Sequence, residues 1–85
     1  MSASAKTALQ LFGSTVRAYR KRLRLTQIEL AARTGMDRSY IGQIERGVSN
    51  VSLHIILRLA TALEIDPTQL IEPLNNRHDL YPSKK

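Results

Sequence analysis

A short helix with clear start and stop signals is the feature that most constrains the fold of this sequence. Thr26 is followed three positions later by Glu29, which is the capping box that begins a helix. Gly35 ends that helix, because the residue just past a helix often needs a positive φ. The segment between them predicts a helix of about eight residues.

A second short helix follows almost at once. Asp37 is placed to cap a helix that runs from Arg38 to about Arg46, and Gly47 ends it. Only a tight turn fits between the two helices. Two short helices joined by a glycine-containing turn predict a helix-turn-helix unit.

The rest of the chain is also predicted to be helical, since apolar residues recur at spacings of three and four and no strand-like alternation occurs. The first helix is expected from about Thr7 to Leu23. Gly13 lies inside it at a cost of roughly 1 kcal/mol, which indicates close packing against a neighbour. The fold class is therefore all-α.

Two further helices complete the predicted domain. Ser52 caps a fourth helix that extends to about Leu63, and Asp66 followed by Pro67 opens a short fifth helix that Pro73 stops. The apolar residues whose spacing is compatible with the core are Leu9, Phe12, Val16, Tyr19, Leu23, Ile28, Leu30, Ala31, Met36, Tyr40, Ile41, Ile44, Leu53, Ile56, Leu57, Ala60 and Leu63.

The length of 85 residues predicts one domain, residues 1–74, with a tail over residues 75–85 in which Leu80 and Tyr81 are the apolar side chains. The absence of cysteine excludes disulfides and thiolate metal sites. No stretch is long and apolar enough to span a membrane. We therefore expect a cytoplasmic protein with no cofactor, no metal and no membrane contact.

The positive charge is concentrated in one part of the chain. The net charge is +6, and residues 17–46 contain eight basic and three acidic residues. The remaining residues contain five basic and four acidic ones. This block of excess charge favours a surface that faces a polyanion, although a merely soluble basic surface is the alternative.

Catalysis is not expected. His54 and His78 are isolated, and no phosphate-binding loop, nucleophile elbow or pair of carboxylates at catalytic spacing occurs. His54 and Arg58, both on the fourth predicted helix, are interpreted as solvated side chains.

The segment TQIELAARTGMDRSYIGQIERG, residues 26–47, resembles the Cro/C1-type (XRE-like) helix-turn-helix family of phage repressors and their bacterial relatives. Ala31 is small where the two helices cross, and Gly35 occupies the turn. The similarity extends from about Phe12 to Leu70 and includes RAYRKRLRLTQ and SLHIILRLATALEIDPTQLI. It implies a five-helix, lambda-repressor-like domain whose third helix enters the major groove of DNA.

The resemblance also implies which residues contact DNA. Arg38 has the chemistry to bind guanine through two hydrogen bonds, and Gln43 could serve adenine in the same way. Asp37 is either a base contact or only a helix cap, and Gly42 either faces bases or allows close approach. The base-reading residues implied by the family are Asp37, Arg38, Ser39, Gly42 and Gln43.

Contacts to the DNA backbone fix the register without reading sequence. Gln27 matches a family position that contacts phosphate, at a helix N-terminus that favours anions. Tyr40 is ambiguous, because its ring suits the edge of the core while its hydroxyl could reach a phosphate. The backbone candidates are Gln27, Tyr40, Arg46, Ser49 and Asn50, with Arg17 at the periphery, where Lys21 and Arg24 could add charge.

Two further expectations follow from the resemblance. Arg20 and Glu45 match a family pair that forms a partly buried ion pair between the first and third helices, so both are interpreted as structural. A homodimer is expected, with an interface formed by Ile65, Leu70, Ile71 and Leu74; closing the core is the alternative role for Ile65 and Leu70.

The functional expectation is a dimeric transcriptional regulator that binds a palindromic site in double-stranded DNA. The similarity of MDRSYIGQIERGVSN and SLHIILRLATALEI to controller proteins of restriction–modification systems implies one specific role, and a phage-type regulator is another. The alternative from a different class is an antitoxin-type module that binds a partner protein as well as its own promoter.

Overall fold

The computed structural model describes residues 7–75 and 77. All of the regular secondary structure in these residues is helical, and short loops join the helices. The helices are α1 (Ala8–Arg22), α2 (Gln27–Thr34), α3 (Arg38–Arg46), α4 (Leu53–Leu63) and α5 (Pro67–Ile71), followed by the 3₁₀ turn η1 (Glu72–Leu74). The all-α, five-helix prediction is confirmed. The predicted tail, including Leu80 and Tyr81, lies almost wholly outside the described residues.

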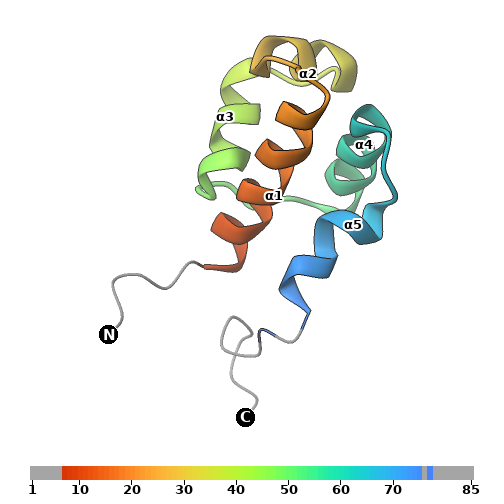
Figure 1. Cartoon of the computed structure of the whole chain (residues 1–85). Helices are drawn as coiled ribbons and strands as arrows, with labels where there is room; N and C mark the ends of the chain where they lie inside the picture. Colours follow the sequence, from red (N-terminus) through yellow and green to blue (C-terminus); the bar gives the residue numbers. More distant parts are fainter. Residues whose placement is uncertain (1–6, 76, 78–85) are drawn as a thin grey trace.

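The helices are arranged around α1 (Figure 1). The ribbon shows α3 on one side of α1 and α4 on the other, with α2 across one end and α5 near the other. Helix α1 packs against α3, α4, α5 and η1, while α2 packs against both α3 and α4. Within the described residues, the side of α3 that carries Arg38, Ser39 and Gln43 is exposed.

The core lies where these helices meet. Apolar side chains from all five helices are buried there: Phe12, Val16, Leu30, Ala31, Ile41, Ile44, Leu59, Ala60, Ala62, Leu63 and Leu70. Burial of each large side chain stabilises the fold by about 1.5–3 kcal/mol.

The described helices were also compared with the length and hydropathy that a membrane span requires. None of those in residues 7–75 meets both requirements.

Local signals fix the helix ends as the sequence predicts. Thr26 Oγ1 accepts a hydrogen bond from the Glu29 N–H at 3.0 Å, and Glu29 Oε1 accepts one from the Thr26 N–H at 2.8 Å. Gly35 follows α2 in the left-handed conformation, with φ of 73°. The capping box fixes the start of α2, and Gly35 forms the turn between α2 and α3.

Three apolar predictions on the helix faces are wrong. Ile28 on α2 and both Leu53 and Leu57 on α4 are exposed instead of facing the core. Each of them fits the helical spacing of the core residues, but Leu30, Leu59 and Ala60 on the same helices are the side chains that are buried in the core. A single apolar residue on the surface is common and needs no partner.

One other expectation needs correction. Arg58 is not a solvated charge, because it is half-buried and its Nη2 donates a hydrogen bond to the Thr34 carbonyl at the end of α2. The fifth α-helix does end before Pro73 as predicted, because α5 ends at Ile71 and Pro73 lies within the 3₁₀ turn η1 that follows. Proline is tolerated in the first turn of a helix, where its missing N–H leaves no bond unmade.

Candidate nucleic-acid interface

Helix α3 combines a buried apolar side with an exposed polar side. Ile41 and Ile44 are buried in the core, and they hold the helix against α1 and α2. On its other side Arg38, Ser39 and Gln43 are exposed. The sequence forms this amphipathic helix between Asp37, its N-cap, and Gly47, its left-handed C-cap.

The exposed end of α3 begins at Asp37. Its backbone has the extended conformation of an N-cap, but its carboxylate accepts no capping hydrogen bond from α3. Asp37 is therefore the N-cap residue of α3 as predicted, but its side chain does not form the predicted capping hydrogen bond. The carboxylate and the neighbouring Arg38 guanidinium are both presented to solvent.

Gly42 is buried, unlike the exposed residues Arg38, Ser39 and Gln43 of the same helix. A Cβ atom built on it would lie 3.2 Å from Arg46 Nη1 and 3.7 Å from Gln27 Oε1. Gly42 therefore makes room for the Gln27 and Arg46 side chains to lie over α3. The space beside Gly42 is thus occupied by the protein's own side chains, and both roles predicted for Gly42 toward DNA stay predictions.

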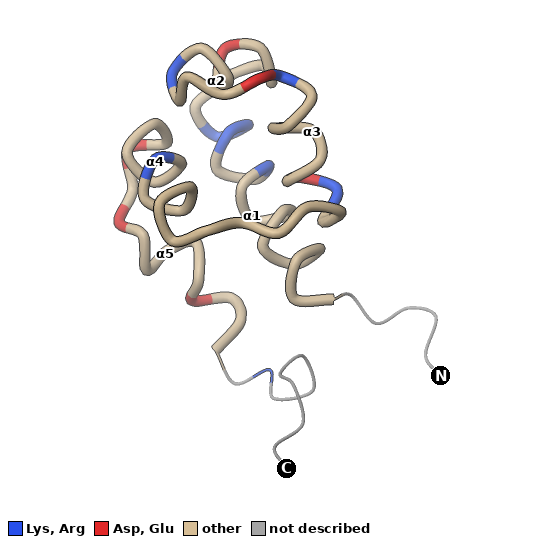
Figure 2. The backbone as a smooth tube through the Cα atoms, turned by 180° about the vertical axis from the view of Figure 1, so that it is seen from behind, with Lys and Arg blue, Asp and Glu red and all other residues tan. Residues whose placement is uncertain are grey.

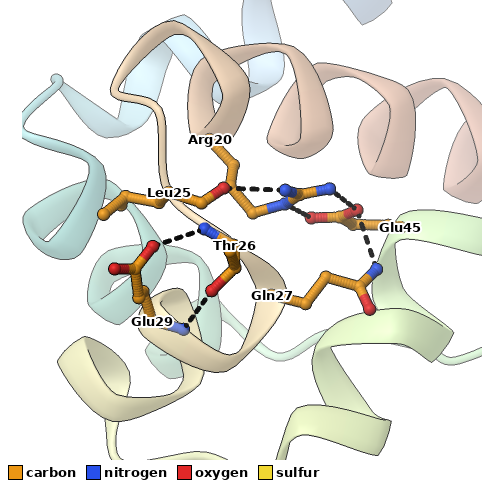
Figure 3. Close-up of polar contacts among 6 residues, drawn as sticks. All are labelled: Arg20, Leu25, Thr26, Gln27, Glu29 and Glu45. Atoms are coloured by element: carbon orange, nitrogen blue, oxygen red, sulfur yellow. Dashed lines mark hydrogen bonds and ion pairs between the residues drawn. The ribbon is translucent and has the colours of Figure 1, made fainter.

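An ion pair joins α1 to α3 beneath this surface (Figure 3). Arg20 Nε donates to Glu45 Oε2 at 2.7 Å and its Nη2 donates to Glu45 Oε1 at 3.0 Å, while Nη1 donates to the Leu25 carbonyl at 2.8 Å. Gln27 Nε2 also donates to Glu45 Oε1, at 3.1 Å. The predicted Arg20–Glu45 ion pair is confirmed, and it also fixes the position of Gln27.

The pKa of Arg20 is raised above its ordinary value, chiefly by the hydrogen bond to Glu45, while burial acts in the opposite direction. A base with a raised pKa adds stability that is fully present below its unfolded-state pKa and is lost as the pH rises through the folded-state value. This pair therefore stabilises the fold across the neutral range and loses that effect only in strongly alkaline solution.

Two hydrogen bonds link α3 to the loop that follows it. Ser49 Oγ donates to Gln43 Oε1 at 3.0 Å, which leaves the amide N–H groups of Gln43 without a partner among the described residues. The Tyr40 hydroxyl donates to the Asn50 carbonyl at 3.2 Å, and its ring packs against the core. The Tyr40 ring therefore lies at the edge of the core as expected, and a contact between its hydroxyl and a phosphate stays a prediction.

The backbone view shows where the charges of the chain lie (Figure 2). Basic positions occur on α1, α2, α3 and α4, and Arg17 and Arg46 are both exposed. The described residues contain no group of three or more His, Cys, Asp or Glu that could hold a metal ion.

Comparison with known proteins gives consistent results. The family model described as helix-turn-helix matches residues 16–70. The control protein C.BamHI of Bacillus amyloliquefaciens is 40% identical over 63 residues, which cover 73% of this chain and 78% of that protein. A match to the regulator SlrR of Bacillus subtilis, at 35% identity, covers 73% of this chain but only 41% of that longer protein.

Solved structures show the same fold. The restriction–modification controller protein C.AhdI from Aeromonas hydrophila has a TM-score of 0.72 at 52% identity, over 73% of this chain and 94% of that one. The controller protein C.Esp1396I, solved as a tetramer in complex with its natural 35-base-pair operator, has a TM-score of 0.73 at 26% identity. That match covers 82% of this chain and 92% of the other.

Proposed function

The chain belongs to the helix-turn-helix family of transcriptional regulators, and from that premise we propose that it binds a palindromic operator in double-stranded DNA as a homodimer. Each subunit places α3 in a major groove, and the two half-sites lie about 34 Å apart on one face of the duplex. The family consists of transcription regulators and not of enzymes.

The observation that carries this proposal is the exposed N-terminal half of α3. Arg38 and Ser39 point away from a helix whose other side is anchored by buried isoleucines. A rigidly held helix with free polar side chains at its start suits contact with base edges. We assign Arg38, Ser39 and Gln43 to base reading, with the Asp37 carboxylate as an acceptor for a cytosine amino group.

The contacts to the DNA backbone flank this helix. Gln27 lies at the N-terminus of α2, oriented by Glu45, and can offer an amide N–H to a phosphate. Arg46, Ser49 and Asn50 lie at the other end of α3, and Arg17 adds positive charge from α1. These side chains position the protein on the duplex without selecting a sequence.

The dimer contact is proposed to use the C-terminal part of the domain. Ile71 is 41% exposed, and with Leu74 it lines a surface cavity of about 500 Å³ that also involves Thr68, Glu72 and Asn75. Leu70 is removed from the predicted interface because it is 0% exposed and belongs to the core. Ile65 packs against the core and can contribute only an edge of the contact.

The relatives favour a particular kind of regulator. C.BamHI, C.AhdI and C.Esp1396I are control or controller proteins, and the last forms a tetramer on its operator. We propose that this chain is likewise a controller of a restriction–modification operon that acts in the cytoplasm, where occupancy of the operator sets transcription. This similarity favours a regulator over the antitoxin-type alternative.

Selection from random duplexes, followed by affinity measurement, tests the proposal. The wild-type protein is expected to enrich one palindromic site. Arg38→Ala should weaken binding to that site by about 1–3 kcal/mol, which is roughly 5- to 150-fold, and weaken binding to random DNA much less. Arg17→Ala is the matched control, because loss of a backbone contact lowers both affinities alike. Failure to enrich any site would overturn the proposal.

A further inference from the structure

A groove lies between the C-terminal end of α2 and the outer side of α4. Its volume is about 360 Å³, which is the lower end of the range in which proteins bind ligands or partner side chains. The DNA contacts proposed above use none of its residues. The groove is lined by Arg33, Thr34, His54, Leu57, Arg58, Thr61 and Ala62.

The charge in this groove is positive and only partly compensated. Arg33 Nη1 donates to the Ala62 carbonyl at 3.0 Å and pairs with Glu64 Oε2 at 3.1 Å. Arg58 binds the Thr34 carbonyl, and within residues 7–75 it has no ion pair with a carboxylate. Among residues 7–75 and 77, no carboxylate pairs with its remaining N–H groups.

Apolar surface borders these cations. Leu57 lines the groove and is 44% exposed, and Leu53, one turn earlier on α4, is 71% exposed. Residues four apart lie side by side on a helix, so the two leucines form one strip. An apolar strip beside the Arg58 guanidinium, which has no carboxylate partner among the described residues, is complementary to a segment that carries both apolar side chains and carboxylates.

The position of the groove separates it from the DNA contact. Both views place α4 on the other side of α1 from α3 (Figures 1 and 2). A duplex held by α3 therefore leaves the groove open. A two-fold contact between copies would bring the same arginines close together, and the repulsion between like charges opposes it.

We propose that this groove docks an acidic, amphipathic segment of a partner protein while DNA is bound. Its carboxylate pairs with Arg58, next to Arg33, and its apolar side chains cover Leu57 and Leu53. This assignment goes beyond the proposed function, because it adds a protein partner to the DNA-binding regulator. Because the pairing is partly electrostatic, the complex weakens as the salt concentration rises.

A synthetic helical peptide with alternating turns of leucine and glutamate is the probe, and the same peptide with lysine in place of glutamate is its control. Titration of the full-length, ¹⁵N-labelled protein is followed by amide shifts, with and without a saturating random-sequence duplex. We expect the acidic peptide to shift the amides of Thr34, Leu57 and Thr61 in both cases, and the lysine peptide to shift none of them.

Two substitutions separate docking from general charge effects. Leu57→Glu should weaken binding of the acidic peptide at least about tenfold, because it removes apolar contact and adds a repelling charge. Val48→Glu makes the same type of change at a residue that is 65% exposed and lies outside the groove, and it should leave the affinity unchanged. Arg58→Gln tests the charge itself, with the amide spectrum reporting whether the fold is kept.

Three results would overturn the proposal: no binding of the acidic peptide, equal binding of the lysine peptide, or shifts confined to α3 that the duplex abolishes. The last result would mean that the peptide only mimics DNA. The titrations with the duplex also show whether the protein binds DNA. A groove that binds no peptide and a protein that binds no DNA therefore give different results.

Discussion

The Arg20–Glu45 ion pair has two roles that a mutational study must separate. The Arg20 side chain is 10% exposed and the Glu45 side chain 4% exposed, so both charges are buried between α1 and α3. Glu45 also accepts a hydrogen bond from Gln27, a proposed DNA contact. Loss of DNA binding after substitution of Glu45 could therefore reflect a misplaced Gln27 or an unfolded domain.

Measurement of unfolding separates these two effects. Arg20→Ala should lower the free energy of unfolding by about 3–5 kcal/mol, because it leaves the Glu45 carboxylate buried without its cation. The double substitution Arg20→Met with Glu45→Leu should restore most of that stability, since apolar residues of similar volume often replace a buried pair. Urea unfolding of the three proteins checks this expectation; equal stability of Arg20→Ala and wild type would contradict it.

The residues that the sequence misplaces share one physical feature: their environment depends on contacts distant in the chain. Arg58 is drawn toward the Thr34 carbonyl, 24 positions earlier, which a helical pattern on α4 does not reveal. Leu53 and Leu57 have the spacing of core residues, yet packing of α4 against α5, α2 and α1 buries other side chains of α4. The spacing of apolar residues predicts reliably that a segment is helical. It does not determine which side of a strongly apolar helix is buried.

At the scale of helices, the boundaries were predictable because local interactions set them. The capping box of Thr26 and Glu29 and the left-handed Gly35 and Gly47 act within a few residues, and each is readable in the sequence. The same logic explains a missed contact at the start of α1, where Thr7 and Gln10 form a second capping box. An interval of three residues between threonine and glutamine is the signal that identifies it.

The contact between α1 and α3 depends on the absence of a side chain at Gly13. A Cβ atom there would lie 2.2 Å from the Ile44 carbonyl oxygen and 2.6 Å from that of Glu45. Gly13→Ala should therefore destabilise the domain by about 1–3 kcal/mol through overpacking, although alanine is the better helix former by about 1 kcal/mol. The close packing predicted from the sequence at this position is confirmed.

Whether Gly13→Ala lowers or raises the stability distinguishes the effect of packing from that of helix propensity. Thermal unfolding of Gly13→Ala should show a lower Tm than wild type, whereas propensity alone would raise it. Ala18→Gly, at an exposed position of the same helix, is the control and should cost about 1 kcal/mol by propensity only. A higher Tm for Gly13→Ala would show that α3 moves away without penalty.

At the scale of the whole molecule, one side of the domain is assigned to DNA, one end to a second copy and another side to a protein partner. Helix α1 lies between these regions and contacts α3, α4, α5 and η1. A domain of this size has a modest core, so the proposed dimer would add to its stability through mass action. If the protein dimerises, its thermal stability should increase with protein concentration.

The location of the dimer contact is the whole-molecule feature most open to direct measurement. Leu74→Glu places a carboxylate beside Glu72 in the surface cavity of η1, so burial of this charge against the equivalent residue of a second copy would be strongly unfavourable. We expect sedimentation velocity to show mainly monomer at concentrations where the wild type is dimeric. Operator affinity should fall together with dimerisation, while the circular dichroism of the helices is retained.

Leu53→Glu is the matched control, because it makes the same substitution at an exposed leucine on α4. The groove bordered by Leu53 is proposed to bind a different protein, so this variant should remain dimeric and retain operator binding. If Leu53→Glu dissociates the dimer and Leu74→Glu does not, the subunit contact lies on α4, and both the α5–η1 interface and the partner groove must be reassigned. If both variants stay dimeric, two copies meet through neither surface, and the spacing of the two α3 helices on DNA must follow from a different two-fold axis.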